Sequence, residues 1–253
     1  MKKFGFEIKK NFSYDFYKKH FKNINILINQ KVKIKLNNPK NFNNWIKKFL
    51  KDFQNHINYE VSNSKKIIFV RHLKTKLNDN SFLGQYRNPS ILKNKTKIKK
   101  KNFSLVFSSP LKRSIETAKK FSNNKIITDK NLMEINYGQA EGLNLTELEK
   151  AYPKIKKAWD NGKDASFPDG ENTSDVLVRV QKFLSKNKNN APFMAFTHQV
   201  VIRVALSNAF GININQSHFL NIKHEYPYKF YFDENLVRSA IPRKDIYSIF
   251  HNE

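Results

Sequence analysis

The chain has 253 residues, enough for one large domain or for one domain with a small appendage. It contains no cysteine, which excludes disulfide scaffolds, thiolate metal sites, iron–sulfur clusters and cysteine nucleophiles. The formal net charge is +26, from 47 Lys and Arg against 21 Asp and Glu, which excludes neither nucleic acid nor phosphorylated metabolites as partners.

Lysine accounts for most of this charge, since only seven of the basic residues are arginine. Abundant Lys, Asn and Ile together are typical of AT-rich codon usage, so the charge is weak evidence for nucleic-acid binding, which also favours Arg. Where this lysine-rich chain has an arginine, we expect that position to need a guanidinium group, whose planar fork can donate two hydrogen bonds to one partner. No apolar run is long enough to span a bilayer, and the first ten residues lack a signal-peptide core, so we expect a cytoplasmic protein.

Residues 1–63 differ from the rest of the chain. They hold 14 Lys and no Arg, and their pattern predicts a helix over 14–21, strands within 24–36 and a helix after Pro39. No motif in this segment carries recognisable chemistry. We interpret it as a basic N-terminal extension or small α+β subdomain, and residues 64–253 as the main domain.

From Lys65 onward, short apolar runs alternate with helical patterns. Strands are expected at 67–70, 105–107, 125–128, 193–196 and 229–232. Helices are expected over 110–121, 145–152, 153–159, 175–184 and 200–210. The first would have Pro110 at its first helical position, the fourth would have Asn172 or Thr173 as its cap, and the last would stop at Gly211. This alternation predicts an α/β fold: a three-layer αβα sandwich with a mostly parallel central sheet.

Polar residues follow three of the predicted strands. They are Arg71 and His72 after the first strand, Ser108, Ser109 and Arg113 after the second, and Thr197 and His198 after the fourth. The carboxyl ends of parallel strands meet at one edge of a sheet, where ligands bind. A neutral imidazole can attack phosphorus while two guanidinium groups hold the phosphoryl oxygens, so the sequence predicts a phosphoryl-transfer site at this edge.

The same residues carry a resemblance to a known family. Residues 71–78 read Arg-His-Leu-Lys-Thr-Lys-Leu-Asn, which resembles the Arg-His-Gly-x-Thr-x-x-Asn signature of the histidine phosphatase (phosphoglycerate mutase-like) superfamily. Four further segments resemble family blocks in the same order: 108–118, 132–142, 168–171 and 197–203. The resemblance implies a phosphoglycerate mutase-like fold.

The resemblance also implies roles for individual residues. His72 is the implied nucleophile, and Glu134 is the implied general acid and, later, general base. Arg71, Arg113 and His198 would line the phosphate pocket, and Asn78 would add a hydrogen bond. Further candidates for substrate contact are Lys74, Arg87 and Glu171. Lys74 and Arg87 could instead be ordinary surface charges, and Glu171 could belong to the cap of the next helix.

Two positions depart from the family pattern. Leu73 replaces the glycine that normally follows the nucleophile, and Gln199 replaces the commoner glycine after the second histidine. A side chain at position 73 would alter the turn if the backbone there needs a positive φ.

We therefore predict a metal-independent phosphomonoesterase that acts through a phosphohistidine on a small phosphorylated metabolite and needs no cofactor. One alternative is a mutase-like phosphotransferase, although little sequence separates Glu134 from His198. Another is a catalytically weak, basic protein that binds phosphate or polyanions. We expect a small phosphorylated substrate as partner, no membrane span and no nucleic acid; a homodimer is an open alternative.

Overall fold

The computed structural model describes residues 65–78, 80–93, 103–210, 214–233 and 236–240. The strands are β1 (Lys65–Arg71), β2 (Leu105–Ser108), β3 (Ile126–Thr128), β4 (Phe193–Thr197), β5 (Pro227–Asp233) and β6 (Leu236–Ala240). The helices are α3 (Lys112–Phe121), α4 (Leu145–Ala151), α5 (Pro153–Asp160), α6 (Thr173–Asn187) and α7 (Gln199–Phe210). Short 3-10 helices cover Lys130–Leu132, Gly138–Ala140, Lys188–Asn190 and Ile214–Phe219. The predicted N-terminal extension of residues 1–63 and the predicted helix stop at Gly211 lie outside the described residues.

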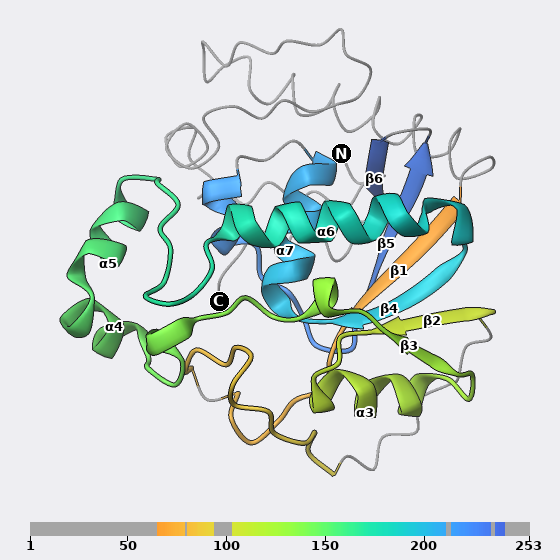
Figure 1. Ribbon diagram of the computed structural model, residues 1–253, viewed down its shortest axis with the longest axis horizontal. Helices are drawn as coiled ribbons and strands as arrows, with labels where there is room; N and C mark the ends of the chain where they lie inside the picture. Colours follow the sequence, from red (N-terminus) through yellow and green to blue (C-terminus); the bar gives the residue numbers. More distant parts are fainter. Residues whose placement is uncertain (1–64, 79, 94–102, 211–213, 234–235, 241–253) are drawn as a thin grey trace, which may run out of the picture.

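The strands form one six-stranded sheet in the order β3-β2-β4-β1-β5-β6 (Figure 1). β1, β2, β3 and β4 pair in parallel, whereas β5 runs antiparallel to both β1 and β6. The mostly parallel α/β sheet predicted from the sequence is thus confirmed. The central strand β4 is buried along its whole length, which is why its sequence is almost continuously apolar.

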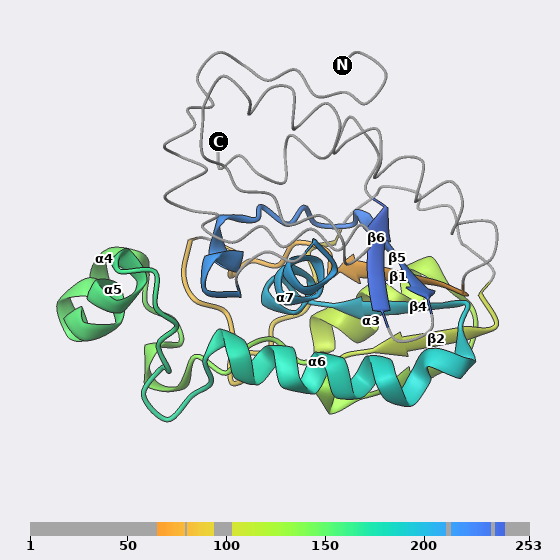
Figure 2. The same ribbon diagram turned by 90° about the horizontal axis from the view of Figure 1, so that it is seen from above.

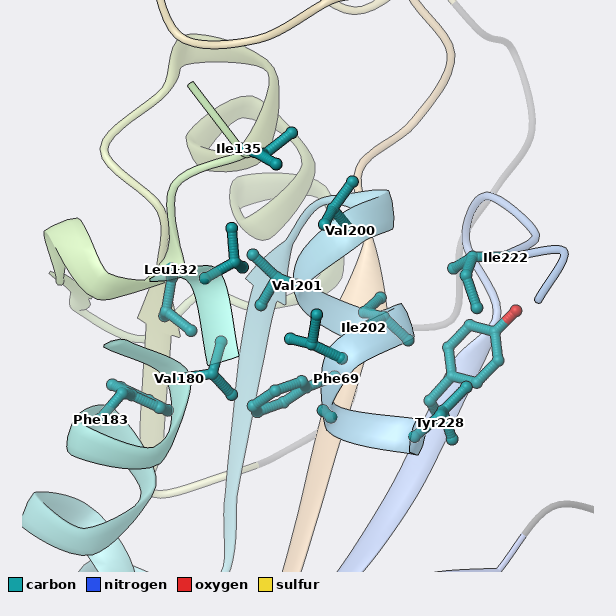
Figure 3. Close-up of a cluster of buried hydrophobic side chains, with 14 of the residues drawn as sticks. Phe69, Leu132, Ile135, Val180, Phe183, Val200, Val201, Ile202, Ile222 and Tyr228 are labelled. Atoms are coloured by element: carbon teal, nitrogen blue, oxygen red, sulfur yellow. The ribbon is translucent and has the colours of Figure 1, made fainter. Parts of the chain in front are cut away.

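Helices cover both faces of the sheet, as the predicted three-layer architecture requires (Figure 2). Along β1, Ile67 and Phe69 belong to a large core that includes side chains of α6 and α7. Ile68 and Val70 point to the opposite face and belong to a smaller core with Ala118 of α3. Successive side chains of a strand alternate between faces, so one apolar strand serves both cores. Figure 3 shows the larger cluster, with Phe69 from the sheet lying between side chains of α6 and α7.

The helix boundaries follow the predicted pattern with one correction. Pro110 is not at the first position of α3, which begins at Lys112 with Leu111 as its cap. The start of α6 is a capping box: the Asn172 side chain accepts from the backbone N–H of Asp175, and the Asp175 side chain accepts from that of Asn172. This satisfies two backbone donors that a helix start leaves unpaired. None of the described helices combines the length and the apolar character that a membrane crossing requires.

Candidate active site

The strand register brings the predicted site residues to one edge of the sheet. Arg71 of β1 lies opposite Thr197 of β4, and Ser108 of β2 lies opposite Phe196. The pairing continues just beyond the strands, where the His72 backbone N–H donates to Thr197 O at 3.0 Å. The residues that follow β1, β2 and β4 are therefore neighbours, as the sequence predicted from the topology of parallel strands.

His72 is buried, with 2% of its surface exposed. Its Nδ1 lies 2.6 Å from the backbone oxygen of Leu73, which can only accept, so Nδ1 carries the proton and Nε2 keeps its lone pair. Burial, together with the nearby cations Arg113 and Arg71, holds the pKa of His72 well below its usual value. The imidazole is therefore neutral at physiological pH and nucleophilic at Nε2.

Two guanidinium groups lie beside this imidazole, and backbone carbonyls hold each of them. Arg113 is fully buried and donates from Nη2 to Gly84 O at 2.7 Å. Arg71 donates from Nη1 to Ile222 O at 2.6 Å. No carboxylate forms an ion pair with either one among the described residues. Burial lowers the pKa of Arg71 to about 10, which still leaves it charged at neutral pH.

His198 is the second buried imidazole. Its ring centroid lies 5.2 Å from that of His72, and its Nε2 lies 2.8 Å from Ser109 Oγ and 3.2 Å from Ser114 Oγ. Burial lowers the pKa of His198 well below its usual value, so it too is neutral. Its Nδ1 is buried without a hydrogen-bond partner among the described residues.

Unpaired buried nitrogens gather around His72. Within the described part of the chain, only four buried side-chain nitrogen or oxygen atoms lack a hydrogen-bond partner, and three of them are Arg71 Nε, Arg113 Nε and His198 Nδ1. Buried polar atoms are rarely left unsatisfied, so a cluster of them calls for an explanation. Both arginines bring a positive charge close to both histidines. The arrangement suits an anion with several acceptor oxygens.

Glu134 follows the Lys130–Leu132 helix, and its carboxylate faces the first turn of α7. One oxygen, Oε1, accepts from the backbone N–H groups of Ile135 and Val200, each at 3.1 Å, and Oε2 accepts from that of Gln199 at 3.0 Å. Burial raises the pKa of this carboxyl, and the Arg113 charge opposes the rise. A carboxyl with a raised pKa near a phosphate site is suited to donate a proton.

The segment that carries Glu134 is held in place by Arg179 and Glu171, and the role of Arg179 was not identified from the sequence. Arg179 of α6 donates from Nη1 to Asn131 O and Met133 O, at 2.8 and 2.6 Å, and from Nη2 to Glu134 O at 3.1 Å. Glu171 pairs with Arg179 through both of its oxygens. Arg179 is one of only seven arginines, and this scarcity was the available signal.

Glu141 plays a similar role for the loop that holds Arg113. Its Oε2 accepts from the backbone N–H groups of Gln85 and Tyr86, both at 3.0 Å, and its Oε1 accepts from that of Arg87 at 2.7 Å. The neighbouring carbonyl of Gly84 is the acceptor for Arg113. Glu141 thus fixes the loop whose carbonyl holds Arg113, a role that its place in a sequence block did not reveal.

The model of a known family matches residues 67–235, about two thirds of the chain, and is described as histidine phosphatase superfamily (branch 1). The chain belongs to the histidine phosphatase superfamily.

Relatives within this superfamily are distant. The chain is 30% identical over 118 residues to "Fructose-2,6-bisphosphatase" of Saccharomyces cerevisiae, an alignment that covers 46% of this chain and 26% of the relative. It is 24% identical over 169 residues to "Phosphoserine phosphatase 1" of Hydrogenobacter thermophilus, which covers 60% and 79%. The chain thus spans about a quarter of the first relative and most of the second.

A solved structure agrees with the fold. The phosphoserine phosphatase from Entamoeba histolytica superposes with a TM-score of 0.60 at 19% identity, over 70% of this chain and 96% of that one. The phosphoglycerate mutase-like fold implied by the sequence blocks is therefore confirmed.

The remaining residues that the superfamily pattern suggested occupy different environments. Asn78 uses its Oδ1 to accept from the backbone N–H and the hydroxyl of Thr75, at 2.7 and 3.0 Å, so only its amide nitrogen is left to donate to a ligand. Lys74 is exposed, and Arg87 is half-buried with Nη1 3.4 Å from Ser81 Oγ. Glu171 also accepts from the backbone N–H of Asn136 at 2.8 Å. Its contacts are those of a residue that positions the Glu134 segment.

The two departures from the superfamily pattern cause no backbone strain. The non-glycine residues with positive φ in the described chain are Asn80, Asp169 and Glu225, so Leu73 has an ordinary conformation. Its side chain is 1% exposed and its backbone N–H donates to Thr117 Oγ1 at 2.9 Å. Gln199 contributes its backbone N–H to Glu134, a role that any residue except proline can fill.

A third histidine, which no motif indicated, lies against His72. His224 donates from Nδ1 to His72 O at 2.6 Å, and the two rings meet edge to face with centroids 5.3 Å apart. Burial lowers the pKa of His224 to about 4. The next residue, Glu225, donates its backbone N–H to Arg71 O at 3.1 Å. The loop before β5 thus holds Arg71 and His72 in place through hydrogen bonds to their backbone oxygens.

Proposed function

We propose that this protein is a metal-independent phosphomonoesterase that acts on a small phosphorylated metabolite through a phosphohistidine intermediate. The observation that carries the proposal is a set of three buried nitrogens without a hydrogen-bond partner among the described residues: Arg71 Nε, Arg113 Nε and His198 Nδ1. All three belong to residues that lie close to the neutral imidazole of His72. The family and the phosphatase names of its relatives support the same reaction.

In the first step, His72 Nε2 attacks phosphorus and forms a P–N bond while the bond from phosphorus to the ester oxygen breaks. Glu134 gives its proton to that oxygen, and the alcohol leaves. Arg71, Arg113 and His198 hold the phosphoryl oxygens, and two guanidinium groups offset the negative charge that the phosphoryl group carries. The bond from Nδ1 to Leu73 O keeps His72 in the tautomer that can attack.

In the second step, ionised Glu134 takes a proton from water, whose oxygen attacks the phosphohistidine. The P–N bond breaks, inorganic phosphate leaves and His72 returns to its neutral form. Because the guanidinium groups already supply positive charge, this chemistry does not call for a metal ion.

The test is hydrolysis of p-nitrophenyl phosphate in the presence of EDTA, comparing the wild-type chain with His72→Ala. We expect turnover that EDTA does not affect and that His72→Ala abolishes, with an unchanged circular dichroism spectrum. An acid-labile phosphoryl label should form on the wild-type protein and be absent from the variant. Glu134→Gln should slow turnover by about 10²–10⁴-fold. Full activity in His72→Ala would refute the mechanism.

A mutase-like phosphotransferase is the second candidate, because "Phosphoglycerate mutase-like protein 4" of Arabidopsis thaliana is 32% identical over 142 residues, 52% of this chain and 59% of that one. The two functions differ in the fate of the phosphohistidine, which a mutase returns to an organic acceptor. Inorganic phosphate released in equal amount to the alcohol product would establish hydrolysis. Phosphate retained on an added acceptor alcohol would establish transfer.

A further inference from the structure

A cavity of about 910 Å³ opens beside the proposed general acid. Side chains of α5, of the start of α7, of the segment that follows Glu134 and of the loop that contains Asn80 and Phe82 line it, whereas Glu134 itself does not. This volume is within the usual range for sites that bind small molecules. It is large compared with a phosphate ion, so it offers room for much more than the group that His72 would attack.

Two residues connect this cavity to the chemistry. Ile135 and Val200 donate their backbone N–H groups to Glu134 Oε1, and their side chains line the cavity. Figure 3 shows both side chains at the same end of the buried cluster. In the proposed reaction, the ester oxygen must come within hydrogen-bond reach of Glu134. Tyr137, which also lines the cavity, lies close enough to Glu134 for the carboxyl charge to act on its hydroxyl. A carbon skeleton attached to the ester oxygen can therefore extend toward Tyr137 and the space beyond it.

Aromatic rings form much of the wall. Phe82, Tyr137 and Phe167 are in mutual contact, with centroids 4.9 Å apart for Phe82–Tyr137 and for Tyr137–Phe167 and 5.9 Å apart for Phe82–Phe167. Trp159 of α5 joins them at 5.7 Å from Phe167. All four residues line the cavity. Offset and edge-to-face packing of this kind can be extended by one further ring.

The charged groups of the lining are mostly engaged with the protein itself. Lys156 pairs with Asp160 at 2.6 Å. Asp164 accepts from the backbone N–H groups of Thr173 and Ser174, at 3.1 and 2.9 Å, at the start of α6. Arg203 donates from Nε to Leu220 O at 2.7 Å and adds positive charge at the inner wall. The lining therefore combines the aromatic rings with two cationic and two acidic side chains that balance in charge, and with polar side chains such as Asn80, Asn161 and Ser217.

From this geometry we infer that the cavity binds the alcohol half of the phosphomonoester, and that this half carries an aromatic ring. This inference rests on the proposed function, because it assigns the substrate class of the same site. The ring would pack against Phe82 and Trp159 while its alcohol oxygen lies at Glu134.

The test compares two alkyl esters whose leaving groups are equally basic: 3-phenylpropyl phosphate and propyl phosphate. We expect kcat/KM to be about 10- to 100-fold higher for the phenyl ester, the discrimination that burial of a few apolar groups supplies. Ala165→Phe, which adds bulk at the cavity wall, should lower kcat/KM for the phenyl ester to the level of propyl phosphate and so remove this preference. Ala151→Phe is the matched control, because Ala151 is exposed on α4 outside the cavity.

Equal kcat/KM for the two esters, or a preference that survives Ala165→Phe, would overturn the inference and leave the phosphatase proposal intact. If neither ester is turned over, isothermal titration calorimetry of each ester with the His72→Ala protein tests whether the cavity binds the phenyl ring. Suppose that His72→Ala binds the phenyl ester more tightly than propyl phosphate, and that the double variant His72→Ala/Ala165→Phe loses this difference. The cavity would then be supported as the binding site of the ring, even though the proposed reaction had failed. Equal binding of both esters would overturn it.

Discussion

At position 73, a buried leucine replaces the glycine of the superfamily pattern, and the structure shows why this is tolerated. The backbone of Leu73 is not in the left-handed region, and its side chain is 1% exposed. The concern that a side chain here would distort the turn is therefore removed. The residue is instead a buried side chain next to His72 in the sequence, and its backbone is tied to Thr117.

Leu73→Gly, which restores the superfamily residue, should destabilise the protein. Loss of a buried leucine side chain and the added backbone freedom of glycine together cost about 3–5 kcal/mol. Urea unfolding followed by circular dichroism measures this change. Leu92→Gly is the matched control, since Leu92 is 40% exposed and should cost less than about 1 kcal/mol. A more stable Leu73→Gly protein would contradict this account of position 73.

The two ionisable groups of the proposed reaction have pKa values shifted in opposite directions. Burial lowers the pKa of His72, so the nucleophile stays neutral to more acidic pH than an ordinary histidine. Burial raises the pKa of Glu134, so the acid keeps its proton to higher pH than an ordinary glutamate. The first step needs neutral His72 and protonated Glu134 together.

We therefore expect kcat/KM for an alkyl phosphate to be highest in mildly acidic solution. It should fall as pH rises through the pKa of Glu134, because the proton donor is lost, and fall again in strong acid as His72 becomes protonated. In Glu134→Gln the remaining activity should lose the fall at higher pH. A profile that keeps this limb in the variant would assign it to another group, most simply to ionisation of the substrate.

At the scale of elements, the loop between the Ile214–Phe219 helix and β5 holds the end of β1 in place. Ile222 O accepts from Arg71 Nη1, His224 donates to His72 O and Glu225 donates to Arg71 O. These bonds join parts of the chain that are about 150 residues apart in sequence. They set the direction of the two residues on which phosphate binding and attack would depend.

His224→Phe should therefore lower kcat while changing KM little. Phenylalanine keeps a ring beside His72 but removes the donor to His72 O, and a small displacement of the nucleophile costs about tenfold or more in rate. His224→Asn should recover much of the loss, because its amide nitrogen can take the place of Nδ1. Steady-state kinetics on p-nitrophenyl phosphate measure both variants. Equal activities of the two variants would show that the hydrogen bond is unimportant.

At the scale of the whole molecule, the net charge of +26 and the buried site predict different responses to salt. Binding of a polyanion to surface lysines releases counterions and weakens steeply as salt increases. Attack within a buried pocket is screened much less. The alternative of a polyanion-binding protein is distinguished from catalysis by this difference.

We expect retention on a heparin column to be lost between about 0.1 and 0.5 M NaCl, while kcat for p-nitrophenyl phosphate changes by less than about threefold. His72→Ala should keep the heparin retention and lose the turnover, since surface charge is unaltered. If turnover instead falls as steeply as retention, substrate capture by the lysine-rich surface is part of the reaction.

The arginines show which part of the site could be predicted from the sequence and which part needed the structure. The sequence indicated that an arginine in this lysine-rich chain would lie where a planar fork is needed. In the structure, Arg71, Arg113, Arg179 and Arg203 each donate to backbone carbonyls of distant segments. The carbonyls themselves were not predictable, because a backbone oxygen carries no residue-specific signal.

The sequence by itself indicated the order of the first five strands and of the helices, and it indicated that His72 and His198 meet at one sheet edge; the strand β6 was not predicted. The resemblance to the superfamily added Arg113 and Glu134 to the proposed site. Apolar periodicity and motif order are local signals, so they can be read without coordinates. Only the tertiary structure decided that His224 lies against His72, that Glu171 supports Arg179, and that a cavity with aromatic walls lies next to the segment that follows Glu134. These features depend on contacts between segments whose spacing along the chain is arbitrary, and packing alone brings them together.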